Sequence, residues 1–206
     1  MKVASFNVRK FGREKLSDKF VRETLIKIAS RYDIIVILEV VDSSGDSVEK
    51  FLRELNQCES SKDKVVDLPG DEDAFAREPY VLRFKCHNTE LEDLVMIPVH
   101  TKPDDAEREL DELYDVFKAV KKKCKTKNIM ILGDFNADGT YLSEAAKKKN
   151  RIWGRNFHWL IEDGVDTTTV CGMLFLTDTE VNKNNFLFEL KPLLFNHTYH
   201  KDLTAK

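Results

Sequence analysis

Polar side chains that can bind a metal ion or transfer a proton follow short apolar runs at several places in this chain of 206 residues. Carboxylate and amide oxygens are ligands that Mg²⁺ prefers, and histidine is the most common general acid or base. Together these residue types predict metal-assisted hydrolysis of a phosphoester. The polar residues at the ends of the apolar runs are Asn7, Glu39, His100, Asp134 and Asn136.

The stretch around Asp134 has two interpretations. Residues 129–132 have the length and apolar character of a strand covered on both faces, and Gly133 lets the backbone turn sharply at its end. Asp134 and Asn136 would then lie just past the carboxyl end of a strand, where open α/β sheets bind ligands. Glycine, aspartate and asparagine are also common turn formers, and the stretch by itself slightly favours a turn. The similar endings elsewhere in the chain favour a site.

Apolar periodicity predicts alternating strands and helices. The predicted strands cover residues 3–6, 34–38, 80–84, 94–99 and 129–132. The predicted helices cover residues 16–31, 47–56 and 104–123. The first helix joins the first two strands in a βαβ unit, which implies parallel pairing or a place in a related mixed sheet. The third and fourth strands flank a polar turn and predict a hairpin. If the strands with polar ends lie in one sheet and point the same way, those ends converge on one crevice.

The same regions carry a more specific signal, because both their order and their spacing match one family. The matching stretches are Ala4-Ser5-Phe6-Asn7-Val8-Arg9, residues 32–40, Arg77-Glu78-Pro79, Ile97-Pro98-Val99-His100-Thr101 and Leu132-Gly133-Asp134-Phe135-Asn136-Ala137-Asp138. The chain resembles the deoxyribonuclease I family over most of residues 3–169, with a gap near residues 58–66. The resemblance implies an α/β fold, the four-layer α/β/β/α sandwich, with part of one sheet missing. It implies one domain over residues 1–206, of which residues 170–206 form a divergent segment.

The resemblance also implies a function, a divalent-metal-dependent endodeoxyribonuclease that hydrolyses the phosphodiester bonds of its DNA substrate. Its cofactors would be Mg²⁺ and Ca²⁺. The implied catalytic residues are His100, Glu39, Asp134 and Asn136. The implied Mg²⁺ ligands are Asn7, Glu39, Asp134 and Asn136, and the implied phosphate-binding residues are Arg9 and Arg77. The possible Ca²⁺ ligands are Asp71, Asp73, the Phe75 carbonyl, Glu78, Asp166 and Thr168, although an acidic solvated loop without metal is at least as consistent with the loop before Glu78.

The chain departs from the family pattern at two places. The polar segment 58–73 has no counterpart of the family's catalytic glutamate and DNA-contacting tyrosine, and residues 170–206 contain neither its Tyr-Asp-Arg strand nor its Ser-Asp-His motif. Losing members of a catalytic set usually costs orders of magnitude in rate. The alternative function is therefore a catalytically inactive variant that binds DNA, metal or a protein partner. His197 and His200 are candidates to replace the missing histidine if the tail folds back beside His100, whereas a solvated tail is the default expectation.

Net charge and hydrophobicity bear on whether the chain binds nucleic acid or a membrane. A formal net charge of −3 gives no broad attraction to nucleic acid, so DNA binding would rely on local patches such as residues 121–127 and 147–151. The first run ends a predicted helix, where lysines interact favourably with the macrodipole, and a solvated face is the favoured interpretation of both runs. Trp153, Phe157 and Trp159 could stack on bases, but core packing is the favoured interpretation. No apolar run is long enough to cross a membrane, so we expect no membrane contact. We also expect a monomer, as the resemblance implies.

Cysteine use and the amino terminus bear on the cellular compartment. The cysteines have no CxxC spacing, which argues against structural zinc and leaves disulfides open. The resemblance implies secretion and a disulfide, but Gly139 stands where the family has the first cysteine of that disulfide, opposite Cys171. The amino terminus lacks the apolar stretch of a secretory signal. Either a signal was removed or this form has none, and a nuclear or cytoplasmic location stays open.

Overall fold

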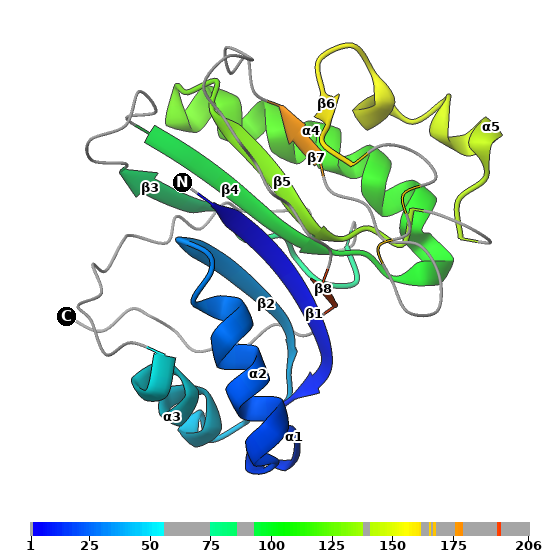
Figure 1. The fold of residues 1–206 in the computed structure, drawn as a ribbon. Coiled ribbons are helices and arrows are strands. Elements are labelled where there is room, and N and C mark those ends of the chain that lie inside the picture. Colours follow the sequence, from blue (N-terminus) through cyan, green and yellow to red (C-terminus); the bar gives the residue numbers. More distant parts are fainter. Residues whose placement is uncertain are drawn as a thin grey trace. The chain divides into compact units, whose positions relative to one another are not determined.

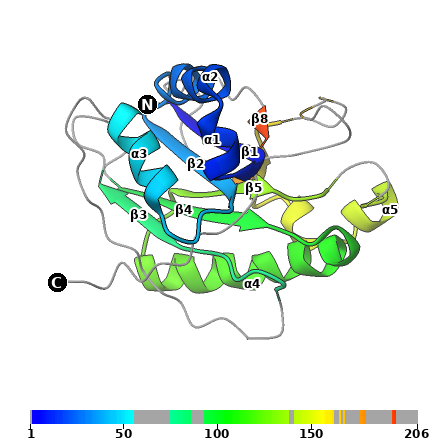
Figure 2. The same cartoon turned by 90° about the horizontal axis from the view of Figure 1, so that it is seen from below.

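The computed structural model describes residues 2–55, 75–85, 93–137, 141–161, 165 and 167, together with the backbone of residues 176–178 and 193–194. The chain forms two compact units, one made of Met1–Lys62 and Phe186–Lys206 and the other of Asp63–Asn185. Each unit contains its own sheet and its own helices (Figures 1 and 2). The predicted mixture of helices and strands is confirmed. That residues 1–206 make one domain with a divergent segment at 170–206 stays a prediction.

The first unit is a three-stranded sheet with helices. Its elements are β1 (Val3–Phe11), α1 (Arg13–Ser17), α2 (Lys19–Ala29), β2 (Ile34–Val40), α3 (Asp46–Leu55) and β8 (Leu193–Leu194). The strand order is β2-β1-β8, and β1 pairs in parallel with both neighbours, which confirms the predicted βαβ unit. The single helix predicted over residues 16–31 is in fact two helices. Asp18 has an extended backbone with ψ of 115° and its side chain caps α2 by accepting from the Val21 N–H at 3.1 Å.

The core of the first unit lies between its sheet and its helices (Figure 2). Phe11 of β1 meets Phe51 of α3 edge to face, with ring centroids 5.2 Å apart. Phe6, Leu25 and Leu38 are also buried in this cluster. Of the apolar residues of α3, Phe51 is buried and Val48 and Leu55 pack partly buried against this core, whereas Leu52 is exposed.

The second unit is a five-stranded sheet covered by a long helix. Its elements are β3 (Leu82–Lys85), β4 (Asp93–His100), η1 (Pro103–Asp105), α4 (Ala106–Cys124), β5 (Ile129–Asp134), α5 (Glu144–Lys147), η2 (Arg151–Trp153), β6 (His158–Trp159) and β7 (Leu176–Asp178). The strand order is β3-β4-β5-β7-β6. Strands β3 and β4 are antiparallel, which confirms the predicted hairpin, and β4 and β5 are parallel. Leu110, Leu113, Phe117 and Val120 form the buried face of α4, as their spacing predicts.

The strands with polar ends do not lie in one sheet. Strands β1 and β2 belong to the first unit, whereas β4 and β5 belong to the second. Each pair is parallel, so the polar residues lie two by two on neighbouring strands within a unit. The sequence gap near residues 58–66, on which the expectation of an incomplete sheet rests, lies outside the described residues. Among the helices that the structure describes, none is long and apolar enough to span a membrane.

Candidate functional site

His100 and Asp134 are neighbours at the ends of two parallel strands of the second unit. They stand opposite each other in the register of β4 and β5. His100 Nε2 lies 3.7 Å from Asp134 Oδ2, and the two side chains are only 9% and 8% exposed. This distance is too long for a direct hydrogen bond but short enough for the carboxylate to stabilise a protonated imidazole. The pair can therefore hold and transfer a proton at the carboxyl ends of these two strands.

Gly133 permits the close approach of the strands that carry this pair. It has a φ of 147°, and a Cβ at this position would lie 1.8 Å from the Val99 carbonyl oxygen. The sequence predicts that the strand ends at Gly133, because glycine favours turns. This expectation is wrong, since β5 continues through Asp134. Its lack of a side chain is what lets β5 lie against β4 one residue before the candidate site.

The loop after β5 is held by hydrogen bonds to the end of β4. Asp134 Oδ1 accepts from the Asn136 N–H at 3.2 Å, so the turn interpretation of this stretch holds just after the strand. Asn136 has a φ of 43° and its Nδ2 donates to the Thr101 carbonyl at 2.9 Å. The Thr101 hydroxyl donates to the Phe135 carbonyl at 2.6 Å. Thr101 thus positions Asn136 and Asp134 together. The sequence pattern does not predict this role, because Thr101 is only the residue that follows His100.

Arg77 is the phosphate-binding candidate of the second unit, and it lies beside His100. Its side chain is half-buried, and Nη1 donates to the His100 carbonyl at 3.3 Å. Of the possible Ca²⁺ ligands, Phe75 is half-buried and Glu78 is exposed. The other members of that set, Asp71, Asp73, Asp166 and Thr168, lie outside the described residues, as do His197 and His200.

Asn7 and Glu39 belong to the parallel strands of the first unit, where Asn7 pairs with Leu38 in the register of β1 and β2. The expectation that the first strand ends before Asn7 is wrong, because β1 continues to Phe11 and Asn7 lies within it. Asn7 is buried, and its Oδ1 accepts from the Arg9 N–H at 3.1 Å. Glu39 Oε2 accepts from the Lys10 N–H at 2.8 Å. Both candidate ligands therefore also hold the backbone of β1, whose register with β2 shifts between Asn7 and Phe11.

The backbone is strained in both strands near this register shift, at Arg9 and Lys10 of β1 and at Glu39 of β2. Arg9, Lys10 and Glu39 have φ values of 42°, 62° and 57°, and the left-handed region costs about 1 to 2 kcal/mol for such a residue. The Lys15 ammonium compensates by donating to the carbonyls of Val8 and Arg9. Burial lowers the pKa of Lys15, while the nearby Glu39 charge raises it and that of Arg9 lowers it. Sequence reasoning missed Lys15, since a single lysine in a short helix carries no distinguishing signal.

The donors in each unit suit a magnesium-type site better than an all-protein cage. Within the described ranges, no three residues of the types histidine, cysteine, aspartate and glutamate are grouped closely enough to hold an ion. Magnesium is commonly bound by one or two carboxylates, with water and substrate phosphate completing its shell. The carboxylate and amide pairs Asn7 with Glu39 and Asp134 with Asn136 fit that pattern, and the buried Asn7 oxygen faces the strained strand end.

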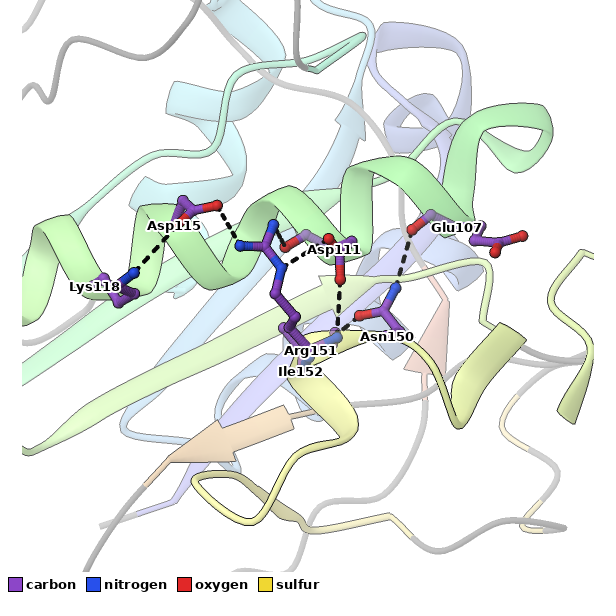
Figure 3. Close-up of polar contacts among 7 residues, drawn as sticks. All are labelled: Glu107, Asp111, Asp115, Lys118, Asn150, Arg151 and Ile152. Carbon is purple, nitrogen blue, oxygen red and sulfur yellow. Dashed lines mark hydrogen bonds and ion pairs between the residues drawn. The ribbon is translucent and has the colours of Figure 1, made fainter. Parts of the chain in front are cut away.

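The segment after the Asn136 loop is fastened to α4 (Figure 3). Arg151 Nε donates to Asp111 Oδ2 at 2.8 Å, and Arg151 Nη1 donates to Asp115 Oδ2 at 2.6 Å. Asn150 Nδ2 donates to the Glu107 carbonyl at 3.0 Å. The basic run 147–151 is therefore not a solvated face at these residues. It serves as an anchor because α4 presents acidic side chains opposite it.

The remaining aromatic and basic features serve packing. Lys147 is only 4% exposed and its Nζ lies 2.8 Å from Glu144 Oε1, so it too departs from the solvated-face interpretation. The Phe157 ring packs 4.9 Å from Phe117 of α4, and Trp153 stacks on Trp159 at 4.1 Å, in line with the favoured core interpretation. A hollow of about 480 Å³ beside the start of α4 is lined mainly by acidic side chains, which would repel phosphate.

Comparison with known proteins gives consistent matches. Residues 4–179 match the model of the Endonuclease/Exonuclease/phosphatase family. The chain is 36% identical over 200 residues to deoxyribonuclease-1-like 1 of Cricetulus griseus, an alignment covering 81% of this chain and 65% of that protein. It is 33% identical over 204 residues to human deoxyribonuclease gamma, covering 82% and 67%. It is 34% identical over 203 residues to deoxyribonuclease-1 of Oryctolagus cuniculus, covering 82% and 72%. The chain thus spans slightly less than two thirds of the first of these relatives.

Proposed function

Because the chain belongs to the endonuclease/exonuclease/phosphatase family, and within it to the deoxyribonuclease I family, we propose that it is a divalent-metal-dependent endodeoxyribonuclease that hydrolyses DNA phosphodiester bonds. Membership of this family also confirms the predicted α/β fold class. A monomeric state and an extracellular location rest on the family resemblance and stay predictions.

The observation that carries the proposal is the approach of His100 Nε2 to Asp134 Oδ2 at 3.7 Å, at the ends of parallel strands. A histidine that is nearly buried beside a carboxylate is suited to proton transfer near neutral pH. Hydrolysis removes a proton from the attacking water and supplies one to the leaving sugar oxygen as the P–O bond breaks. We assign one of these transfers to His100, with Asp134 stabilising its protonated form.

The other candidate residues are proposed to position phosphate and metal. Arg77, which is tied to the His100 carbonyl, would place positive charge beside the reacting phosphate, and Arg9 would contact phosphate from the first unit. The two carboxylate and amide pairs would hold Mg²⁺, which when bound supplies charge stabilisation at the phosphoryl oxygens. Phe75 and Glu78 would contribute to a Ca²⁺ site through oxygen ligands.

Nicking of supercoiled plasmid by the purified chain tests this function. We expect relaxed circles to accumulate with Mg²⁺ and Ca²⁺ present and not with chelator. His100→Ala should lower the nicking rate by about 100-fold or more, the usual contribution of general acid-base catalysis. His158→Ala is the matched control, because His158 is exposed in the same unit. Equal nicking by the wild type and His100→Ala would reject the proposed role of His100.

The second candidate function is the catalytically inactive family variant that binds DNA, metal or a protein partner. It is favoured by the sequence of residues 170–206, which lacks the family's Tyr-Asp-Arg and Ser-Asp-His motifs. The same assay separates the two candidates. An inactive variant would nick no faster than His100→Ala and Glu39→Ala, yet it would still retain labelled duplex DNA or Mg²⁺ in a direct binding titration.

A further inference from the structure

Glu109 is a buried acid that the proposed chemistry does not use. It lies in the first turns of α4 and is 1% exposed, the lowest fraction of any charged residue in the described part of the chain. A buried carboxylate is costly unless hydrogen bonds compensate for its lost hydration. A buried glutamate at this position therefore needs hydrogen-bond donors, and the structure contains two of them.

The two oxygens of Glu109 hold two separate backbone segments. Oε1 accepts from the Ala76 N–H at 3.0 Å, and Oε2 accepts from the Lys102 N–H at 3.3 Å. Ala76 precedes Arg77, and Lys102 follows His100 by two residues. Arg77 Nη1 in turn donates to the His100 carbonyl at 3.3 Å. The carboxylate thus closes a ring of contacts around the backbone of the candidate catalytic histidine.

We propose that Glu109 is a positioning residue, which fixes the His100 backbone by holding the segments that contain Ala76 and Lys102. This inference rests on the proposed function in so far as His100 takes part in catalysis. Only a carboxylate offers two acceptor oxygens, one for each of these N–H groups. A glutamine would offer one oxygen acceptor and turn an NH₂ donor towards the other N–H.

The electrostatics of Glu109 agree with a role in positioning the backbone near His100 rather than in stabilising the fold. Burial raises the pKa of its carboxyl group, and the negative charge of Asp105 acts in the same direction. The N–H groups of Ala76 and Lys102 and the Arg77 guanidinium lower that pKa in part. Burial therefore disfavours the charged form of Glu109, and an apolar side chain would serve simple packing as well.

The test compares Glu109→Gln with Glu107→Gln, which changes an exposed acid on the same turn region of α4. We expect Glu109→Gln to lower kcat for plasmid nicking by about 10- to 100-fold, the cost of misplacing a catalytic group, while KM changes much less. Glu107→Gln should leave both parameters unchanged. An effect of Glu109→Gln on KM alone, or no effect at all, would overturn the proposal.

A double variant separates positioning from general loosening of the fold. If Glu109 acts through His100, the variant carrying Glu109→Gln and His100→Ala should nick no more slowly than His100→Ala alone. Multiplication of the two losses would show that Glu109 acts elsewhere and would overturn the proposal.

Amide hydrogen exchange gives a readout that does not depend on nuclease activity. The Ala76 and Lys102 amides should exchange about 10-fold or more faster in Glu109→Gln than in the wild type, because each loses its buried acceptor or meets a donor. Unchanged exchange at both amides would overturn the proposal. If the wild type fails to nick DNA, the proposed function fails, while the exchange rates still decide whether Glu109 holds these two segments.

Discussion

Replacing Gly133 with alanine tests whether the close approach of β4 and β5 positions the candidate site. The new Cβ would lie 1.8 Å from the Val99 carbonyl oxygen, and real Cβ atoms keep at least 3.0 Å. The two strands must therefore separate locally by about 1.2 Å. This movement occurs one register position before His100 and Asp134, and it strains the hydrogen bond from the Thr101 N–H to the Asp134 carbonyl, now 3.0 Å.

The expected loss of stability has two parts. Placing a non-glycine residue at this positive φ costs of order 1 to 3 kcal/mol, and overpacking a well-packed core costs about as much again. The free energy of unfolding should therefore fall by about 2 to 6 kcal/mol. For a chain of this size, each kcal/mol corresponds to roughly 2 to 4 °C in Tm, so a mid-range loss lowers Tm by about 8 to 16 °C.

Thermal unfolding followed by circular dichroism measures this loss, and plasmid nicking below the lowered Tm measures its effect on the site. The matched control is Gly154→Ala. Gly154 has an ordinary φ of −70°, and a Cβ added there would lie 2.9 Å from the Arg151 carbonyl oxygen, so the backbone must shift by only about 0.1 Å to reach 3.0 Å. We expect that control to change Tm by no more than about 3 °C. A Gly133→Ala protein that melts within this range and nicks at the wild-type rate would refute the argument.

Two further predictions concern the first unit. Burial opposes ionisation of Asp42, but hydrogen bonds from the start of α3 and from Ser44 lower its pKa overall. Its stabilising effect is therefore present above the ordinary aspartate pKa of roughly 4 and is lost as pH falls below that value. In urea unfolding, Asp42→Asn should cost about 1 kcal/mol at pH 7 and much less at about pH 3. An equal cost at both pH values would contradict this prediction. Lys15→Met should free the strained backbone of β1, because it removes the ammonium that donates to the Arg9 carbonyl. The free energy of unfolding should fall by about 1 kcal/mol, and hydrogen exchange of the Arg9 amide should become faster. Unchanged exchange of this amide would contradict the role of Lys15 in holding β1.

The sequence predicts most of the elements because their signals are local. The apolar run 129–132 is fully buried in β5, and the stripe of Leu110, Leu113 and Phe117 forms the buried face of α4. A hydrophobic pattern reports which side of an element meets the core, so such elements follow directly from it. The parallel pairing of β1 with β2 follows too, since a short helical connection joins them.

Pairing between distant strands is not encoded in such patterns. Nothing in the alternation of residues says that β2 and β4 belong to different sheets, because a polar strand end looks the same in either arrangement. The role of Glu109 could not be predicted from the sequence for a different reason. An acid in the first turns of a helix is expected from the macrodipole alone, so its contacts with Ala76 and Lys102 become visible only in three dimensions.

The residues that break local rules nevertheless point to the candidate site. In the described part of the chain, the non-glycine residues with positive φ are Arg9, Lys10, Glu39, Lys125 and Asn136. Lys125 has an ordinary explanation, because it is the left-handed cap of α4. Each of the others is a candidate site residue or its immediate neighbour.

Such strain lowers stability and persists only where surrounding contacts hold it. Those contacts are present in both units. The Lys15 ammonium and the Glu39 carboxylate hold β1, while Thr101 and Asp134 hold the loop at Asn136. A fold shaped for stability alone would relax these positions to ordinary backbone geometry. Their coincidence with the ends of the parallel strands therefore supports a site that places polar groups at a cost to the fold.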